Sequence, residues 1–206
     1  MRISCIILAA ASLLLATLVW GADFQKGLDA YSSADYETAL AEWQPLAEAG
    51  DIGSQFGLGQ MYGNGFGVTM DDAAAIKWYG LAAGQGHAAA QCNLAVMHQN
   101  GWGLPQNDVE AMRLFGLAAD QGVTEAMIAL GRFYAMDFGE DYDPIQAYKW
   151  FSLALLLEDI DASAKRDAIS DKMSAEQVAE GDALVAAWSG SHAGLLASDG
   201  ASGAAA

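Results

Sequence analysis

The chain has 206 residues, of which 53% are hydrophobic, and 26 acidic residues against nine basic ones give a formal net charge of −17 at pH 7. A surface this acidic repels phosphate groups, which excludes nucleic acid as an expected partner and makes an anionic membrane equally unfavourable. Two cysteines in a chain of this length are too few to build a disulfide framework.

The N-terminus has the pattern of an export signal. Met1 and Arg2 precede an apolar run over residues 3–20, and the small residues Gly21 and Ala22 follow. This order predicts a secretory signal peptide over residues 1–22. The run also reaches the lower length limit of a membrane span, so an uncleaved N-terminal anchor is the alternative. Both interpretations predict export to the periplasm or the cell exterior, and cleavage leaves no segment for stable membrane insertion.

Residues 23–50 have the pattern of a short helix pair. A first helical stretch is followed by a tight Ser-Ser-Ala-Asp turn and by a second stretch that ends at Gly50. Small and apolar residues recur three and four positions apart in both stretches, which is typical of helices with one buried face. We expect this segment to form an N-terminal capping pair.

The most informative feature is an internal repeat of 36 residues. Residues 51–86 recur as 87–122 and, more degenerately, as 123–158, and the first two copies agree at 14 of 36 positions. A period of this length indicates a solenoid, in which each unit buries its apolar face against its neighbours. The sequence therefore predicts an all-α protein, an α-solenoid of stacked antiparallel helix pairs.

Each copy contains a first helix, a glycine-rich turn and a second helix. Asp71, Asn107 and Asp143 occupy one repeat position and are good N-cap residues for the second helix. Gly59, Ala95 and Gly131 share another position, inside the first helix, where a glycine costs about 1 kcal/mol relative to alanine. We expect a close approach of another helix backbone at that position.

These residues resemble the Sel1-like repeat, a relative of the tetratricopeptide repeat with a longer loop between its helices. The resemblance covers residues 51–158 and implies a right-handed superhelix of helix pairs. It also implies an adaptor that binds a protein or peptide through its concave surface. The residues that carry the resemblance in the first copy are Leu58, Gly59, Tyr62, Gly65, Gly67, Val68, Asp71, Ala75, Trp78, Tyr79, Ala82, Ala83 and Gly86.

The segment after the repeats is expected to close the stack. Residues 162–169 and 174–188 have helical patterns, and Ser174 with Gln177 forms a capping-box sequence. We therefore expect C-terminal capping helices over residues 159–188. Residues 189–206 are mainly Gly, Ala and Ser, a composition that predicts a disordered tail.

The sequence offers little that points to chemistry. His87, His98 and His192 show no metal-binding spacing with other ligands, and we expect no catalytic residues, cofactor or metal. The acidic loop from Asp137 to Asp143 is more typical of a solvated loop than of a calcium site. Cys92 lies where the other copies have apolar residues, which predicts a buried side chain.

The favoured function is therefore a non-enzymatic, exported and monomeric scaffold that binds a protein or peptide. Two alternatives stay open: a periplasmic enzyme acting on cell-wall fragments or β-lactams, and a passive structural element. Phe66 and Trp102 are apolar rings at equivalent loop tips, which either fold back on the helices or meet a partner. The remaining candidate contacts lie on the first helices and are Gln55, Phe56, Gln60, Gln91, His98 and Arg132.

Overall fold

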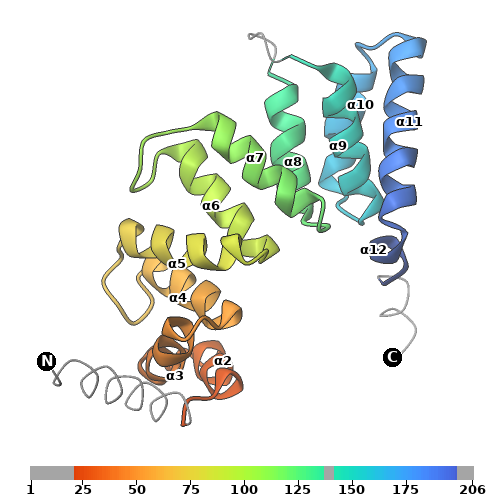
Figure 1. Cartoon of the computed structure of the whole chain (residues 1–206). Coiled ribbons are helices and arrows are strands. Elements are labelled where there is room, and N and C mark those ends of the chain that lie inside the picture. The colour runs from red at the N-terminus through yellow and green to blue at the C-terminus, as the bar shows by residue number, and fades with distance from the viewer. Residues whose placement is uncertain (1–20, 137–141, 199–206) are drawn as a thin grey trace, which may run out of the picture. The chain divides into compact units, whose positions relative to one another are not determined.

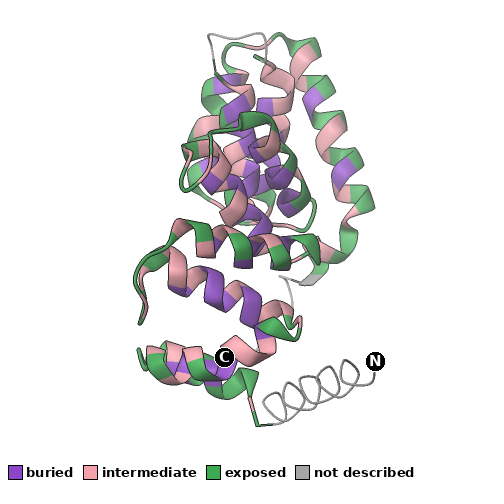
Figure 2. Ribbon diagram, turned by 60° about the vertical axis from the view of Figure 1, so that its left-hand side comes forward, coloured by how far each residue is buried: buried purple, intermediate pink, exposed green. Residues whose placement is uncertain are grey.

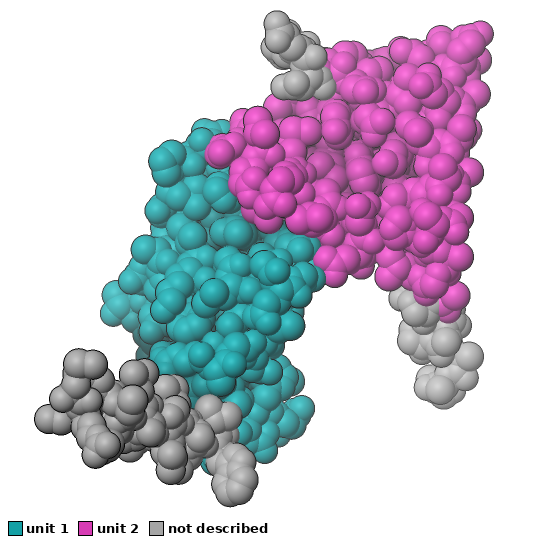
Figure 3. Space-filling model, viewed as in Figure 1, with its two compact units in different colours: residues 1–106 teal, residues 107–206 magenta. Residues whose placement is uncertain are grey.

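The computed structural model describes residues 21–136 and 142–198, and within these ranges the chain forms helices and turns without a strand (Figure 1). The all-α prediction is confirmed. The described residues form two compact units, which Figure 3 colours separately and which divide after Gln106. The predicted hand of the superhelix depends on how these units are placed, and it stays a prediction.

The described part of the first unit, residues 21–106, contains five helices, each packed against the next along the chain. The second unit continues this pattern: α7 packs on α8 and α8 on α9, while α10 and α11 both pack on α9. Stacked helix pairs are therefore confirmed. The helices of the first unit are α2 (Phe24–Ser32), α3 (Tyr36–Glu48), α4 (Ile52–Asn64), α5 (Asp72–Gly84) and α6 (Ala88–Asn100). Those of the second are α7 (Asp108–Ala119), α8 (Thr124–Tyr134), α9 (Pro144–Leu156), α10 (Asp161–Ser170), α11 (Ala175–Ser191) and α12 (Ala193–Ser198).

The repeated N-cap position behaves as predicted. Side chains of Asp71, Asn107 and Asp143 accept hydrogen bonds at 3.0 Å from backbone N–H groups in the first turns of α5, α7 and α9. These bonds satisfy donors that have no partner within the helix. The start of each second helix is thus set by the same local interaction in all three copies.

Glycines end the first helices of two copies. Gly65 after α4 and Gly101 after α6 have φ values of 70° and 69°, in the left-handed region that residues with a Cβ rarely adopt. The next glycines, Gly67 and Gly103, have φ values of 69° and 68°. The two loops between paired helices therefore share one backbone path, and their tip residues occupy equivalent places.

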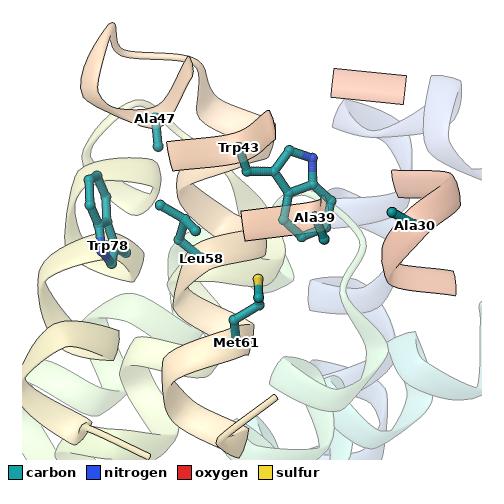
Figure 4. Packing of buried hydrophobic residues seen from close by; sticks show 7 residues of the cluster. All are labelled: Ala30, Ala39, Trp43, Ala47, Leu58, Met61 and Trp78. Atoms are coloured by element: carbon teal, nitrogen blue, oxygen red, sulfur yellow. The ribbon is translucent and has the colours of Figure 1, made fainter. Parts of the chain in front are cut away.

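The core of the first unit is built around Trp43 of α3, which is 2% exposed. Figure 4 shows Leu58 of α4 between Trp43 and Trp78 of α5. Along the described helices, buried positions lie on the sides that face neighbouring helices and exposed positions on the outer sides (Figure 2). The stack is therefore stabilised by large rings on second helices that pack against small residues on first helices.

The group that packs against the shared small position of the first helix differs from the prediction. A Cβ added at Gly59 would lie 2.5 Å from the ring of Tyr79, and one added at Gly131 would lie 2.6 Å from the ring of Phe151. An aromatic ring of the paired helix, rather than another helix backbone, excludes the side chain. The prediction of close packing is confirmed, while the packing group is corrected.

The predicted capping segment contains α10 and α11, and Ser174 and Gln177 form the expected capping box. The tail prediction is wrong over residues 189–198, because α11 continues to Ser191 and α12 follows. The ring of His192 stacks on Trp188 with centroids 4.1 Å apart, and the methyl groups of Leu195 lie beside Gly122. These contacts supply apolar burial that the Gly/Ala/Ser composition hides. Residues 199–206 lie outside the described residues.

Candidate binding site at the repeat loops

A hollow of about 180 Å³ lies within the first unit, where the loop after α6 approaches the loop end of α4 and the start of α5. We call it the Trp102 pocket. Its lining combines one large aromatic ring, one carboxylate, two amides and a phenol with apolar side chains. The lining residues are Gly63, Asn64, Asp72, Tyr79, Asn93, Val96, Met97 and Trp102.

The pocket exists because the two loops meet different residues. Each loop packs against the first residue of the second helix in the preceding pair: Gly67 against Tyr36, and Gly103 against Asp72. In the first case the loop-tip ring of Phe66 stacks on Tyr36, with centroids 5.2 Å apart and planes 6° apart. In the second case Asp72 supplies no ring. Trp102 is consequently 53% exposed, compared with 37% for Phe66.

A missing side chain deepens the pocket on the α4 side. Gly63 occupies the repeat position that holds Gln99 in the next copy. A Cβ at residue 63 would lie 3.6 Å from Ala75 Cβ and 3.7 Å from the Tyr79 hydroxyl, both ordinary contact distances. The glycine therefore leaves open space over Tyr79 without being required by its own backbone.

The phenol in the pocket is held in its neutral form. Burial raises the pKa of Tyr79 to about 12, and a hydrogen bond between its side chain and Asn93 acts weakly in the opposite direction. Tyr79 therefore keeps its proton at any physiological pH. Asp72 is therefore the charged group of the pocket.

Asp72 and Asn64 present acceptor oxygens. Asn64 donates its Nδ2 to the Gln60 carbonyl at 2.9 Å, which leaves the Oδ1 atom as an acceptor. Asp72 is half-buried in the first turn of α5, and within the described part of the chain its carboxylate has no hydrogen bond or ion pair. The pocket therefore offers negative charge and acceptors beside an exposed ring.

Two of the predicted contact residues are structural. Gln55 is 3% exposed and donates its Nε2 to the Ala47 carbonyl at 3.0 Å, while Gln91 is 4% exposed and donates to the Ala83 carbonyl at 3.2 Å. Both bonds span eight residues and join a first helix to the end of the preceding second helix. Both amides are buried in the packing between helix pairs, because each satisfies a buried carbonyl.

The other first-helix candidates are scattered. Phe56 is half-buried and stacks on His87 with centroids 4.5 Å apart. Burial lowers the pKa of His87, so this ring is neutral near pH 7. Gln60 and His98 are half-buried, and Arg132 is exposed on α8 in the second unit. Of the eight candidates, only Trp102 lines the pocket.

Seven of the eight lining residues were not among the candidates, including Asp72, Asn93 and Tyr79. Asp72 follows an N-cap, and an acidic residue is common in the first turn of a helix. Nothing in its local sequence therefore marks it as part of a pocket. The available signal is a comparison across copies, because the equivalent residue of the N-terminal pair is Tyr36. That comparison becomes informative only when the loop is known to pack on this position.

The described residues show no other centre of chemistry. Within residues 21–136 and 142–198, no three His, Cys, Asp or Glu side chains are placed to hold a metal ion, and Cys92 is buried as predicted. Most of the acidic loop, residues 137–141, lies outside the described residues, whereas Asp143 is used as an N-cap. No described helix has the length and hydropathy to cross a membrane. The predicted signal at 1–22 lies almost entirely outside the described residues.

The fold and the loop geometry define a helical-repeat protein with a small surface pocket. Residues 52–87, 88–123 and 124–159 each match the Sel1 repeat model, and together they make up more than half of the chain. The chain therefore belongs to the Sel1 repeat family. Proteins with this repeat typically mediate protein–protein interactions, and the fold is generally a non-enzymatic scaffold.

Similar proteins include regulators and structurally defined repeat proteins. A 63-residue stretch is 41% identical to the exopolysaccharide production negative regulator of Rhizobium leguminosarum bv. viciae and 38% identical to that of Rhizobium meliloti (strain 1021). It makes up 31% of this chain and 24% of each relative, so the chain spans about a quarter of the length of these curated relatives.

Two crystal structures share the fold. A Sel1 repeat protein from Oxalobacter formigenes superposes with a TM-score of 0.66 and 28% identity, over 70% of this chain and 59% of that protein. A protective antigen of uropathogenic Escherichia coli strains, described as displaying an SLR fold, superposes with a TM-score of 0.55 and 23% identity. That match covers 84% of this chain and 46% of the antigen.

Proposed function

We propose that this protein is an exported, non-enzymatic scaffold that binds another protein through the exposed surface of its Sel1 repeats. The observation that carries the proposal is the Trp102 pocket, in which an exposed ring, a carboxylate and an amide converge on a rigid helical support. Rings and charged groups on a preorganised surface are the usual anchors of protein interfaces.

Two further observations support binding as the activity. The three copies keep their N-caps and buried rings, while the loop-tip rings of the first two copies, Phe66 and Trp102, differ in type and exposure. The curated relatives are named as negative regulators of exopolysaccharide production. A regulator can act by binding alone, and we propose that this chain also acts in that way.

Export rests on the composition of residues 1–22. A fusion to a reporter enzyme that is active only outside the cytoplasm tests it. We expect the full-length fusion to be active and a fusion lacking residues 1–22 to be inactive at equal expression. Equal reporter activity in both fusions would contradict export by this segment.

Site-specific photocrosslinking in the native cell tests binding. A photoreactive residue placed at Trp102 or Gln60 should give a discrete adduct with one other protein. The same residue at Leu81, which is 44% exposed on a second helix, serves as the matched control. Absence of any adduct from Trp102, Gln60 and Arg132 would overturn the scaffold proposal. An adduct from Leu81 alone would overturn its assignment to the loops and first helices.

A further inference from the structure

We infer that the Trp102 pocket binds an arginine side chain of the partner protein, with the guanidinium stacked on the Trp102 indole and paired with Asp72. This inference rests on the proposed function and specifies the chemistry of the partner. It follows from the charge of the lining, the free face of the indole and the size of the hollow.

The lining selects for a cation. Asp72 contributes a half-buried carboxylate, Asn64 contributes Oδ1, and none of the eight lining residues is basic. A neutral ligand that covered Asp72 would remove water from the carboxylate and leave its charge unpaired, which is costly. A cation compensates for that charge, and the net charge of −17 attracts basic partners to the whole surface.

The indole of Trp102 supplies the second half of the site. Across the described residues no aromatic ring stacks on Trp102, in contrast to Phe66, which is stacked on Tyr36. Two of the other described indoles have a cation over the ring: Lys77 Nζ lies 4.4 Å from the centroid of Trp78, and Lys149 Nζ lies 3.9 Å from that of Trp150. A cation over a tryptophan face is among the strongest contacts of this kind.

Arginine fits this combination better than lysine. Its guanidinium is planar, so it can lie flat on an indole while its N–H groups reach a carboxylate and an amide oxygen in the same plane. The group has five donors and no acceptor, which suits the Asp72 carboxylate and the Asn64 Oδ1 atom. A hollow of about 180 Å³ accommodates one such side chain rather than a folded segment.

The test titrates the full-length protein with the peptide Gly-Gly-Arg-Gly-Gly and, separately, with its citrulline counterpart, which has the same shape without the charge. The readout is the NMR signal of the Trp102 indole N–H, assigned by its loss in Trp102→Ala, together with the dissociation constant from calorimetry. We expect the arginine peptide to shift this signal, and the citrulline peptide to bind at least threefold more weakly.

Variants locate the effect. Asp72→Asn should weaken binding by roughly two- to fivefold, as for a partly exposed ion pair. Asp108→Asn removes the same charge at the equivalent position of the next copy and should leave affinity unchanged. Gly63→Gln should fill the pocket and abolish binding, while Gly80→Gln adds the same side chain at a helical glycine outside the lining, where a Cβ meets no atom within 4 Å, and should bind normally.

Three results would overturn the inference: equal affinity for the citrulline peptide, equal loss in Asp72→Asn and Asp108→Asn, or full affinity in Gly63→Gln. Saturable binding of a neutral oligosaccharide such as cellopentaose, but not of the arginine peptide, would also overturn it and indicate a sugar site. The two proposals can fail separately. If the scaffold proposal fails, no photocrosslinked adduct forms in the cell. If only this inference fails, the adduct forms and Gly63→Gln does not change its amount.

Discussion

Gly57 and Gly80 should respond in opposite directions to the same substitution. Both lie inside helices of the first unit, Gly57 in α4 and Gly80 in α5. A Cβ at Gly57 would lie 2.6 Å from Cε3 and Cζ3 of Trp43, whereas a Cβ at Gly80 would meet no atom within 4 Å. Packing requires the glycine at residue 57. Gly80 only lowers the stability of its helix, and alanine would remove that penalty.

The magnitudes follow from two opposing terms. Alanine in place of a helical glycine gains about 1 kcal/mol through helix propensity at either site. At Gly57 overpacking costs about 1–3 kcal/mol. The upper part of that range applies, because Gly27 abuts the pyrrole end of the same indole and prevents Trp43 from moving aside. We expect Gly57→Ala to lose about 1–2 kcal/mol and Gly80→Ala to gain about 0.5–1 kcal/mol.

Urea unfolding followed by the fluorescence of buried tryptophans measures both effects, and because both residues lie in one unit the same transition reports them. Thermal midpoints should separate by roughly 6–24 °C, since the variants differ by about 1.5–3 kcal/mol and 1 kcal/mol moves the midpoint of a unit of this size by about 4–8 °C. Trp43→Phe should lose less stability in the Gly57→Ala background than alone. A Gly57→Ala variant as stable as Gly80→Ala would refute the packing argument.

Three further predictions concern single residues. Gln55→Ala should cost about 1–3 kcal/mol, because it leaves the buried Ala47 carbonyl without its donor, and urea unfolding should show this loss while binding of the arginine peptide stays unchanged. Glu158 occupies the repeat position of Gly86 with a φ of 66°, so Glu158→Gly should raise the stability of the second unit by about 0.5–1 kcal/mol in thermal unfolding. The folded pKa of Tyr79, about 12, exceeds the unfolded value of about 10, so the contribution of its neutral phenol is complete below pH 10 and is lost as the pH rises through 12. The stability of the protein relative to Tyr79→Phe should fall by about 2–3 kcal/mol over that range, and a constant difference would contradict the assigned burial.

Most of the fold could be predicted because its determinants are local and repeated. The N-caps at Asp71, Asn107 and Asp143 and the glycines that follow the helices act within a few residues, and each appears more than once. The tail shows the limit of composition as a guide. Trp188, His192 and Leu195 lie four and three residues apart, a helical spacing that the surrounding Gly, Ala and Ser residues concealed.

The binding site was much less predictable, because its determinants lie in different copies. The burial of Gln55 and Gln91 had one signal in the sequence: polar residues are usually exposed, but the third copy has the apolar Met127 at this position. Trp102 was recognisable as an exposed ring on a loop. Its carboxylate partner was not, because contact between a loop and a helix start of the preceding copy cannot be inferred from spacing alone.

The register of the repeat also predicts how the pocket can be closed. Asp72→Tyr restores the ring that Tyr36 provides for Phe66, and the loop backbone needs no change because both loops share one path. The aromatic pair should contribute about 0.5–1.5 kcal/mol, partly offset by the loss of a first-turn carboxylate. Solvent should reach Trp102 less readily, which the hydrogen-exchange rate of its indole N–H can report. The arginine peptide should no longer bind. If Trp102 stays as accessible as before, the absence of a ring at residue 72 is not what opens the pocket.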